Sequence, residues 1–109
     1  MDKVSIEHFK KLNLVVGLVV ECSAVAGSKK LLKLRVDLGS FGIRQILAGL
    51  KGFYDPDEMV GKKIVVVENL EPAKMMGEES QGMLLAVTSK DSVLILEPSK
   101  FCQPGDIIS

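Results

Sequence analysis

Apolar and polar residues alternate over residues 31–38, which is the pattern of a β-strand with one face against a core. The positions expected to face the core are Leu32, Leu34, Val36 and Leu38, and those expected to face outward are Lys33, Arg35 and Asp37. Residues 14–26 are almost continuously apolar, which predicts a long strand that is buried on much of both sides. Gly17 lies within this run and predicts a bulge or bend of the kind that a small closed barrel requires.

Three further apolar segments are bounded by turn-forming residues and predict strands at residues 43–48, 62–68 and 83–88, and a turn then leads into a flanking apolar segment, residues 93–96. The segment after residue 97 contains two prolines and a glycine, so we expect an irregular tail there. This tail ends in an apolar pair, Ile107 and Ile108, which we expect to be exposed.

Two short helices are also expected. Over residues 5–12, Ser5 is placed to cap a helix whose apolar Ile6 and Phe9 share one face, and we expect this helix to plug one end of the core. Over residues 55–61, an Asp-Pro pair, acids in the first turn and a closing glycine indicate a second helix of one to two turns. The single domain, residues 1–109, is therefore predicted to be all-β. The order of its elements is that of a five-stranded OB-fold barrel with a short helix between strands 3 and 4.

The connection between the predicted strands 62–68 and 83–88, which we call the 69–83 connection, breaks the apolar alternation. It contains one proline and two glycines, and we expect a long structureless segment. Such segments are uncommon in compact domains and tend to be functional. This one supplies hydrogen-bond donors, acceptors and soft apolar groups, which makes it a candidate binding element. Its polar residues could equally be turn formers, and at least one of Met75 and Met76 could fill a core gap.

Written out from residue 69, the connection reads Asn-Leu-x-Pro-x-Lys-x-Met-Gly-x-x-Ser-x-Gly-Met. This pattern resembles the characteristic loop of a small tRNA-binding domain family, and the resemblance covers roughly residues 9–96. Members occur at the C-terminus of many methionyl-tRNA synthetases and as free-standing dimeric proteins. The resemblance implies an OB-fold and a non-catalytic role in protein biosynthesis, namely binding of the outer corner of folded tRNA in the cytoplasm. It also implies a homodimer, or partnership with a synthetase catalytic core.

Charge is segregated along the chain although the total is zero, with 14 basic and 14 acidic side chains. A neutral total argues against non-specific binding of nucleic acid. However, residues 22–36 contain no acid, whereas residues 55–79 contain seven acids against three lysines. The basic group comprises Lys29, Lys30, Lys33, Arg35 and Arg44, all expected on the first turn and on the outer side of strands 2 and 3. This group could be an ordinary solvated face or a surface that binds phosphate.

Combining the resemblance with the charge pattern gives a set of residues expected to contact RNA. The set is Lys30, Lys33, Arg35, Asn69, Lys74, Met76, Ser80, Gln81 and Met83. The family pattern places a phosphate against Lys74, for which the alternative is a local surface ion pair. For Asn69, Ser80 and Gln81 it implies either hydrogen bonds to the RNA backbone or bracing of the loop. Aromatic residues are only 5% of the chain, which favours recognition of backbone and shape over base stacking.

No catalytic, cofactor or metal motif is recognisable. Ser80 lacks the flanking glycine of a nucleophile elbow, and two cysteines with one histidine are too few for a zinc site. We expect Cys22 and Cys102 to be free thiols in a reducing cytoplasm, with no membrane partner. The rival hypothesis is a chaperone-like protein of the same fold, similar to export-related members of the superfamily, which binds unfolded polypeptide. The segment Lys30-Leu31-Leu32-Lys33-Leu34 favours the tRNA hypothesis instead.

Overall fold

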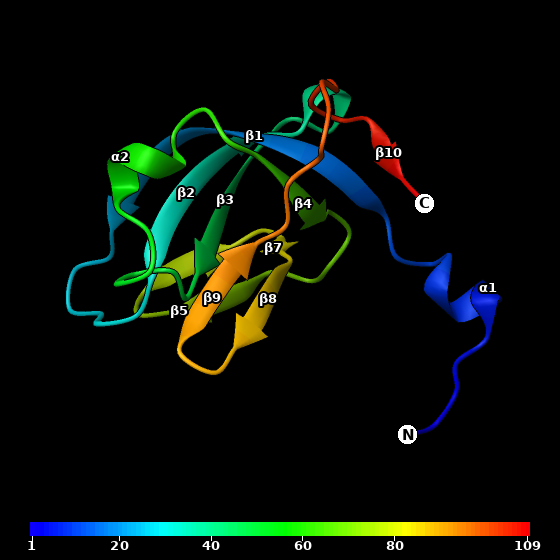
Figure 1. Ribbon diagram of the computed structural model, residues 1–109, viewed down its shortest axis with the longest axis horizontal. Helices are drawn as coiled ribbons and strands as arrows, with labels where there is room; N and C mark the ends of the chain where they lie inside the picture. Colours follow the sequence, from blue (N-terminus) through cyan, green and yellow to red (C-terminus); the bar gives the residue numbers. More distant parts are fainter.

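The computed structural model describes residues 1–109 as a curved antiparallel sheet with two small hairpins and short flanking pieces (Figure 1). The sheet order is β3-β2-β1-β4-β7, and it closes into a nearly complete five-stranded barrel. The elements are α1 Ile6–Phe9, β1 Leu14–Ala24, β2 Leu32–Asp37, η1 Gly39–Phe41, β3 Ile43–Ala48, α2 Pro56–Met59, β4 Lys63–Val67, β5 Ala73–Met75, β6 Glu78–Ser80, β7 Met83–Leu84, β8 Ala86–Ser89, β9 Ser92–Ile95 and β10 Ile107–Ile108. The predicted OB-like barrel is thus confirmed, with α2 between β3 and β4 as expected.

The barrel interior is filled by the residues that the alternation in β2 assigned to it. Leu32, Leu34, Val36 and Leu38 are all completely buried. Helix α2 contributes Met59 to the same core, also completely buried, and its start is fixed by a capping box between Asp55 and Glu58. No helix of the structure has the length and apolar character needed to cross a membrane.

The bulge in β1 lies at Val20 rather than at Gly17. Pairing of β1 with β2 changes register between Val19 and Glu21, so the extra residue falls there. Gly17 serves packing instead, because a Cβ at this position would lie 2.5 Å from Val36 Cγ1 and 2.9 Å from Leu38 Cδ2. The predicted bulge was therefore misplaced, since a glycine that is required for space looks the same in a sequence as one required for a bend.

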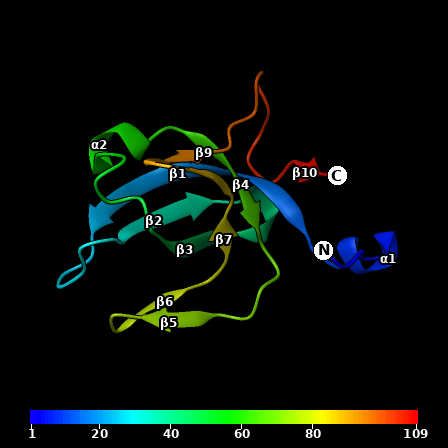
Figure 2. The same cartoon turned by 60° about the horizontal axis from the view of Figure 1, so that its bottom comes forward.

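The 69–83 connection is not structureless, as the sequence pattern had predicted. Strands β5 and β6 pair antiparallel as a hairpin, which we call the signature hairpin, and Figure 2 shows it as an arm beside β3. Its two-residue turn consists of Met76 and Gly77, with φ values of 54° and 78°. Positive φ at both positions is the geometry that matches the twist of a hairpin. The predicted strand 83–88 is also divided, because Leu85 lies where the chain leaves β4 and begins to pair with β9.

The N-terminal helix α1 does not plug the core. Ser5 caps it as expected, since its Oγ accepts a hydrogen bond from the His8 amide at 3.2 Å, but no residue of α1 is buried. The flank of the barrel at the start of β1 is taken by the C-terminal segment, in which Gly105 N donates to Val16 O at 2.7 Å. Strand β10 then pairs with the beginning of β1, and α1 lies outside the barrel (Figure 1). The tail is therefore only partly irregular.

Candidate nucleic-acid interface

A polar hollow of about 600 Å³, which we call the basic groove, lies on the outer face of β1, β2 and β3. Its lining is Val20, Glu21, Cys22, Ser23, Lys33, Arg35, Gln45 and Val60. The outward parity of β2 places Lys33 and Arg35 here, next to Ser23 and Glu21 of β1 in the strand register. No aromatic ring lines the groove, so it offers charge and hydrogen bonds but no surface for stacking bases. Burial raises the pKa of the Cys22 thiol, which keeps it protonated and poorly reactive.

Both cations in the basic groove have a carboxylate partner. Lys33 Nζ lies 3.1 Å from Glu78 Oε2, and Arg35 Nε lies 3.8 Å from Glu21 Oε2. Because Glu78 belongs to β6, the first of these pairs joins the groove directly to the signature hairpin. Lys30 lies in the exposed turn between β1 and β2. The groove and the hairpin therefore meet at the pair of Lys33 and Glu78.

Arg44 does not belong to the outward basic group. It is opposite Val36 in the strand register and therefore shares the core-side parity. Its guanidinium donates to Glu68 Oε1 at 3.0 Å and to the backbone oxygens of Glu68, Phe41 and Gln81 at 3.0, 3.3 and 3.4 Å. With these four acceptors, Arg44 ties β3 to both ends of the 69–83 connection. The predicted outward position was wrong because it counted Arg44 by charge rather than by strand parity.

Glu68, the partner of Arg44, is held in its charged form. Asn13 Nδ2 donates to Glu68 Oε2 at 2.7 Å, and this hydrogen bond is the main reason that the pKa of Glu68 is below its usual range. The hydrogen bond and charge of Arg44 act in the same direction. The carboxylate thus joins β1, β3 and β4 just before the 69–83 connection begins.

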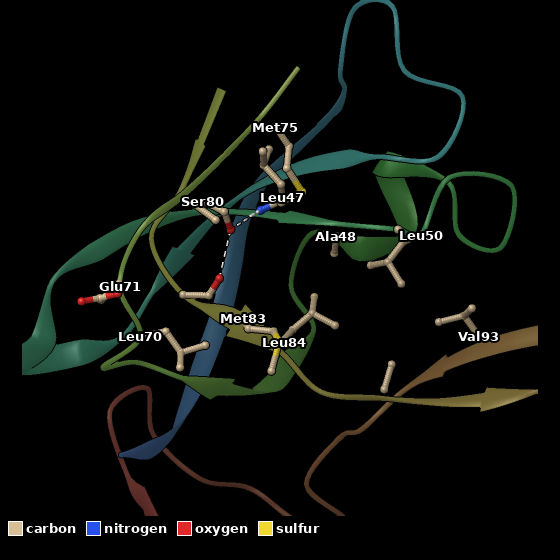
Figure 3. Close-up of a pocket in the computed structure, with 14 residues that line it drawn as sticks. Leu47, Ala48, Leu50, Leu70, Glu71, Met75, Ser80, Met83, Leu84 and Val93 are labelled. Atoms are coloured by element: carbon tan, nitrogen blue, oxygen red, sulfur yellow. Dashed lines mark hydrogen bonds between the residues drawn. The ribbon is translucent and has the colours of Figure 1, made fainter. Parts of the chain in front are cut away.

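Ser80 and Gln81 fix the signature hairpin to the edge of β3. Ser80 is buried; its Oγ accepts from Leu47 N and donates to Gly82 O, both at 3.0 Å, and Figure 3 marks both bonds. The backbone N–H of Gln81 donates to Gln45 O at 2.7 Å, and the side-chain Oε1 of Gln81 accepts from Gln45 N at 3.0 Å. The side chains of Ser80 and Gln81 thus accept hydrogen bonds from backbone amides of β3 that a neighbouring strand would otherwise accept. Their geometry is that of loop bracing, one of the two roles left open by the sequence.

Asn69 has the same bracing geometry at the root of the 69–83 connection. Its Oδ1 accepts from Asn13 N at 2.7 Å, and its Nδ2 donates to Lys11 O at 2.6 Å. The side chain is therefore used within the protein, and it joins the connection to the residues between α1 and β1. Among the expected RNA contacts, the exposed residues are Lys30, Arg35, Asn69, Lys74, Met76 and Met83.

A second hollow, which we call the apolar groove, lies between the signature hairpin and the barrel. It has a volume of about 420 Å³, and the hydrophobic side chains around it come from β3, β5, β7, β8 and β9. Figure 3 shows Met75 and Met83 among its lining residues. Met75 and Met83 keep 37% and 47% of their surface exposed, so neither is a core residue, and Met76 at the turn is 56% exposed. No group of three or more histidine, cysteine or acidic side chains gathers as a metal site.

Sequence reasoning did not identify Glu21, Gln45 and Glu78 as part of the site. Gln45 and Glu21 could have been found from strand parity and register, because both lie beside Arg35 on the outer face. Glu78 was counted only among the acids of the 69–83 connection. Its contact with Lys33 spans 45 positions in the sequence and depends on the fold of the hairpin, so no local signal indicates it.

Comparison with known proteins adds four likenesses. Residues 14–107 match the sequence family described as "Putative tRNA binding domain". Over 106 residues, 97% of the chain, the sequence is 45% identical to the methionine–tRNA ligase of Helicobacter pylori strain J99 and spans 16% of that enzyme's length. The fold superposes on a MetRS-related protein from Pyrococcus horikoshii with a TM-score of 0.92 and 34% identity, covering all of both chains. It also superposes on the chaperone CsaA from Bacillus anthracis, with a TM-score of 0.90, 28% identity and coverage of 99% and 100%.

Proposed function

The chain belongs to the family of tRNA-binding domains, and on this premise we propose that it binds the outer corner of folded tRNA as a non-catalytic module in the cytoplasm. The observation that carries the proposal is the continuity of the basic groove with the signature hairpin through Lys33 and Glu78. Phosphate contacts provide affinity, and a rigid arrangement of such contacts provides recognition of shape.

The rigidity of this surface supports recognition of a folded RNA. Hydrogen bonds of Ser80, Gln81 and Gln45 hold the hairpin against β3, and Arg44 holds both ends of the connection. Lys74 projects from the face of the hairpin opposite to Met75, because neighbouring residues of a strand alternate. The cations on β2 and on the hairpin are therefore held at a fixed separation. The phosphates of a folded RNA can match this separation, whereas the phosphates of a flexible strand have no fixed spacing.

In the cell the domain would increase the affinity of a synthetase for tRNA, or it would act as a separate tRNA carrier. Its methionine–tRNA ligase relative is about six times longer, as the 16% coverage indicates, so association with a synthetase catalytic core is part of the proposal. Both roles require the same tRNA-binding surface.

We expect Lys33→Ala and Lys74→Ala each to weaken binding of folded tRNA, with the salt dependence of log Kd flattened by about 1 for each substitution. Each substitution removes one cation that would neutralise a phosphate. Met83→Ala should weaken binding with no change in salt dependence, because its side chain offers contact rather than charge. The measurement is a filter-binding titration at several KCl concentrations.

Lys90→Ala is the matched control for these lysine substitutions, because Lys90 lies in the turn between β8 and β9 and lines neither groove. It should leave both affinity and salt dependence near those of the wild type. Equal effects of Lys90→Ala and Lys33→Ala would mean that only the total charge matters, and the proposed surface would then be wrong.

We also propose that the chain forms a homodimer through its terminal segments. Ile6, Phe9 and Leu12 line a hollow of about 250 Å³ together with Ile107 and Ile108, and Ile6 and Ile107 are 58% and 62% exposed. Exposed apolar clusters of this kind mark interfaces. Phe9→Glu should convert a dimer to a monomer in sedimentation at micromolar concentration, with circular dichroism unchanged because Phe9 is outside the core. A monomeric wild-type protein would contradict the proposal.

The rival function, binding of unfolded polypeptide, is favoured by the apolar groove and by the likeness to CsaA. An extended apolar segment would contact Met75 and Met83 rather than the lysines of β2. Met75→Ser with Met83→Ser should then abolish binding of a reduced, unfolded polypeptide, and Lys33→Ala should not affect it. If the wild-type protein binds this polypeptide and shows no gel shift with folded tRNA, the chaperone function replaces the tRNA function.

A further inference from the structure

The cations of the basic groove are already paired with carboxylates of the same chain. Glu78 and Glu21 provide one carboxylate for each of its two cations, Lys33 and Arg35, so the groove is locally neutral before any ligand arrives. A phosphate that approaches Lys33 must therefore exchange with the Glu78 carboxylate. Of the two pairs, Lys33 with Glu78 is the closer and the less exposed, at 3.1 Å against 3.8 Å.

Glu78 is held in place from both sides of its contact with Lys33. One carboxylate oxygen, Oε2, accepts from Lys33, and the other, Oε1, accepts from Gln45 Nε2 at 3.3 Å. The same Gln45 amide also donates to Glu79 O at 2.8 Å, which fixes the backbone of β6 beside β3. The hairpin register, in which Glu78 is opposite Met75, thus turns the carboxylate toward Lys33 and Gln45.

We propose that Glu78 is a specificity-determining residue, whose carboxylate occupies Lys33 in place of an RNA phosphate and so selects folded RNA over flexible strands. The proposal rests on the tRNA-binding function proposed above. A folded RNA that is already aligned by Arg35, Lys74 and Met83 can place a phosphate at Lys33 and complete the exchange. A flexible strand that is held by only one or two contacts cannot, and it meets a neutral groove.

The expected size of the effect follows from the exposure of the pair. The Lys33 and Glu78 side chains are 32% and 35% exposed, so water and salt screen their attraction. Exposed ion pairs of this kind change an equilibrium by about two- to fivefold. This is too small to prevent binding of a well-fitting RNA but large enough to lower the occupancy of a poorly fitting one.

The test compares Glu78→Gln with Glu79→Gln in the full chain, for a folded tRNA and for a twenty-residue oligouridylate. The two substitutions remove the same charge from neighbouring positions, but Glu79 is opposite Lys74 on the other face of the hairpin and makes no contact with Lys33. Glu78→Gln should increase affinity for oligouridylate about fivefold and affinity for tRNA about twofold at most. Its salt dependence with oligouridylate should steepen by about 0.7, the value for one added phosphate contact on a single strand.

The double variant Lys33→Gln with Glu78→Gln keeps the result interpretable if removal of Glu78 changes the hairpin. In this variant the gain should disappear, because no cation is released. Equal effects of Glu78→Gln and Glu79→Gln, or a gain that persists without Lys33, would overturn the proposal. Failure of the tRNA function would look different: the wild-type protein would show no preference for tRNA over oligouridylate, while the comparison of the two glutamates on oligouridylate would still measure the release of Lys33.

Discussion

Gly17→Ala should lower the free energy of unfolding by about 1–3 kcal/mol, the usual cost of adding a methyl group to a filled core. The new Cβ would lie 2.5 Å from Val36 Cγ1, 2.9 Å from Leu38 Cδ2 and 3.1 Å from Val66 Cγ2. All three neighbours are completely buried side chains, Val36 and Val66 from the strands that flank β1 and Leu38 from the residue just after β2, so the new methyl group has no free space to enter. Urea unfolding, followed by circular dichroism, measures the loss.

Gly49→Ala is the matched control for this substitution. Gly49 lies just after β3, and a Cβ there would meet no atom within 4 Å. Removing the flexibility of a glycine from the unfolded chain is stabilising where the folded backbone tolerates a side chain. Gly49→Ala should therefore be neutral or slightly stabilising. Similar losses at positions 17 and 49 would mean that backbone freedom, not lack of space, explains the need for glycine at position 17.

Arg44→Ala should lower the free energy of unfolding by about 2–3 kcal/mol, because it removes hydrogen bonds to four acceptors, one of them a charged carboxylate. The estimate lies below that for a fully buried ion pair, since the Arg44 side chain keeps 26% of its surface exposed. Arg35→Ala is the matched control, because the only other arginine of the chain makes one exposed contact at 3.8 Å. It should change stability by less than about 0.5 kcal/mol.

The loss in Arg44→Ala should also depend on pH. In the folded protein the pKa of Glu68 is lowered, first by the hydrogen bond from Asn13 and then by Arg44. The charged carboxylate therefore stabilises the fold above the pKa of an unfolded glutamate, and this contribution disappears as pH falls through the lower folded pKa. Wild type and Arg44→Ala should differ most at neutral pH and converge in acid. A difference that is constant between pH 7 and pH 3 would mean that the charge of Glu68 is not involved.

Strand parity predicted the barrel and the outward cations of β2 well, because alternation is a local property and a one-residue error would expose four leucine and valine side chains. The signature hairpin could not be predicted in this way. Its turn places Met76 at positive φ, a position where Gly, Asn or Asp is expected, so the usual hairpin signal is missing. The position of α1 outside the barrel could not be predicted locally either, because it depends on the pairing of β1 with β10, which lies at the other end of the chain.

The candidate site was predictable in its residue types but not in its internal contacts. Lys33, Arg35 and Lys74 stand out by charge and parity. Their surroundings depend on side chains far away in the sequence, such as Glu78 beside Lys33 and Gln45 beside β6. The resemblance to the tRNA-binding family made Ser80 and Gln81 either hydrogen-bond partners of the RNA backbone or braces of the loop. Their partners turned out to be the amides and carbonyls of β3 and of Gly82, which is visible only once the strands are in place.

The side chain of Asn69 forms hydrogen bonds only with main-chain atoms of the segment before β1, namely the carbonyl of Lys11 and the amide of Asn13. The hydrogen bond from Asn69 to residue 11 therefore does not depend on the side chain at position 11, since every amino acid has a backbone carbonyl. Substitutions at position 11 can therefore change the surface beside α1 while the 69–83 connection keeps its anchor. The terminal segment and the 69–83 connection can therefore diverge in sequence independently at this contact.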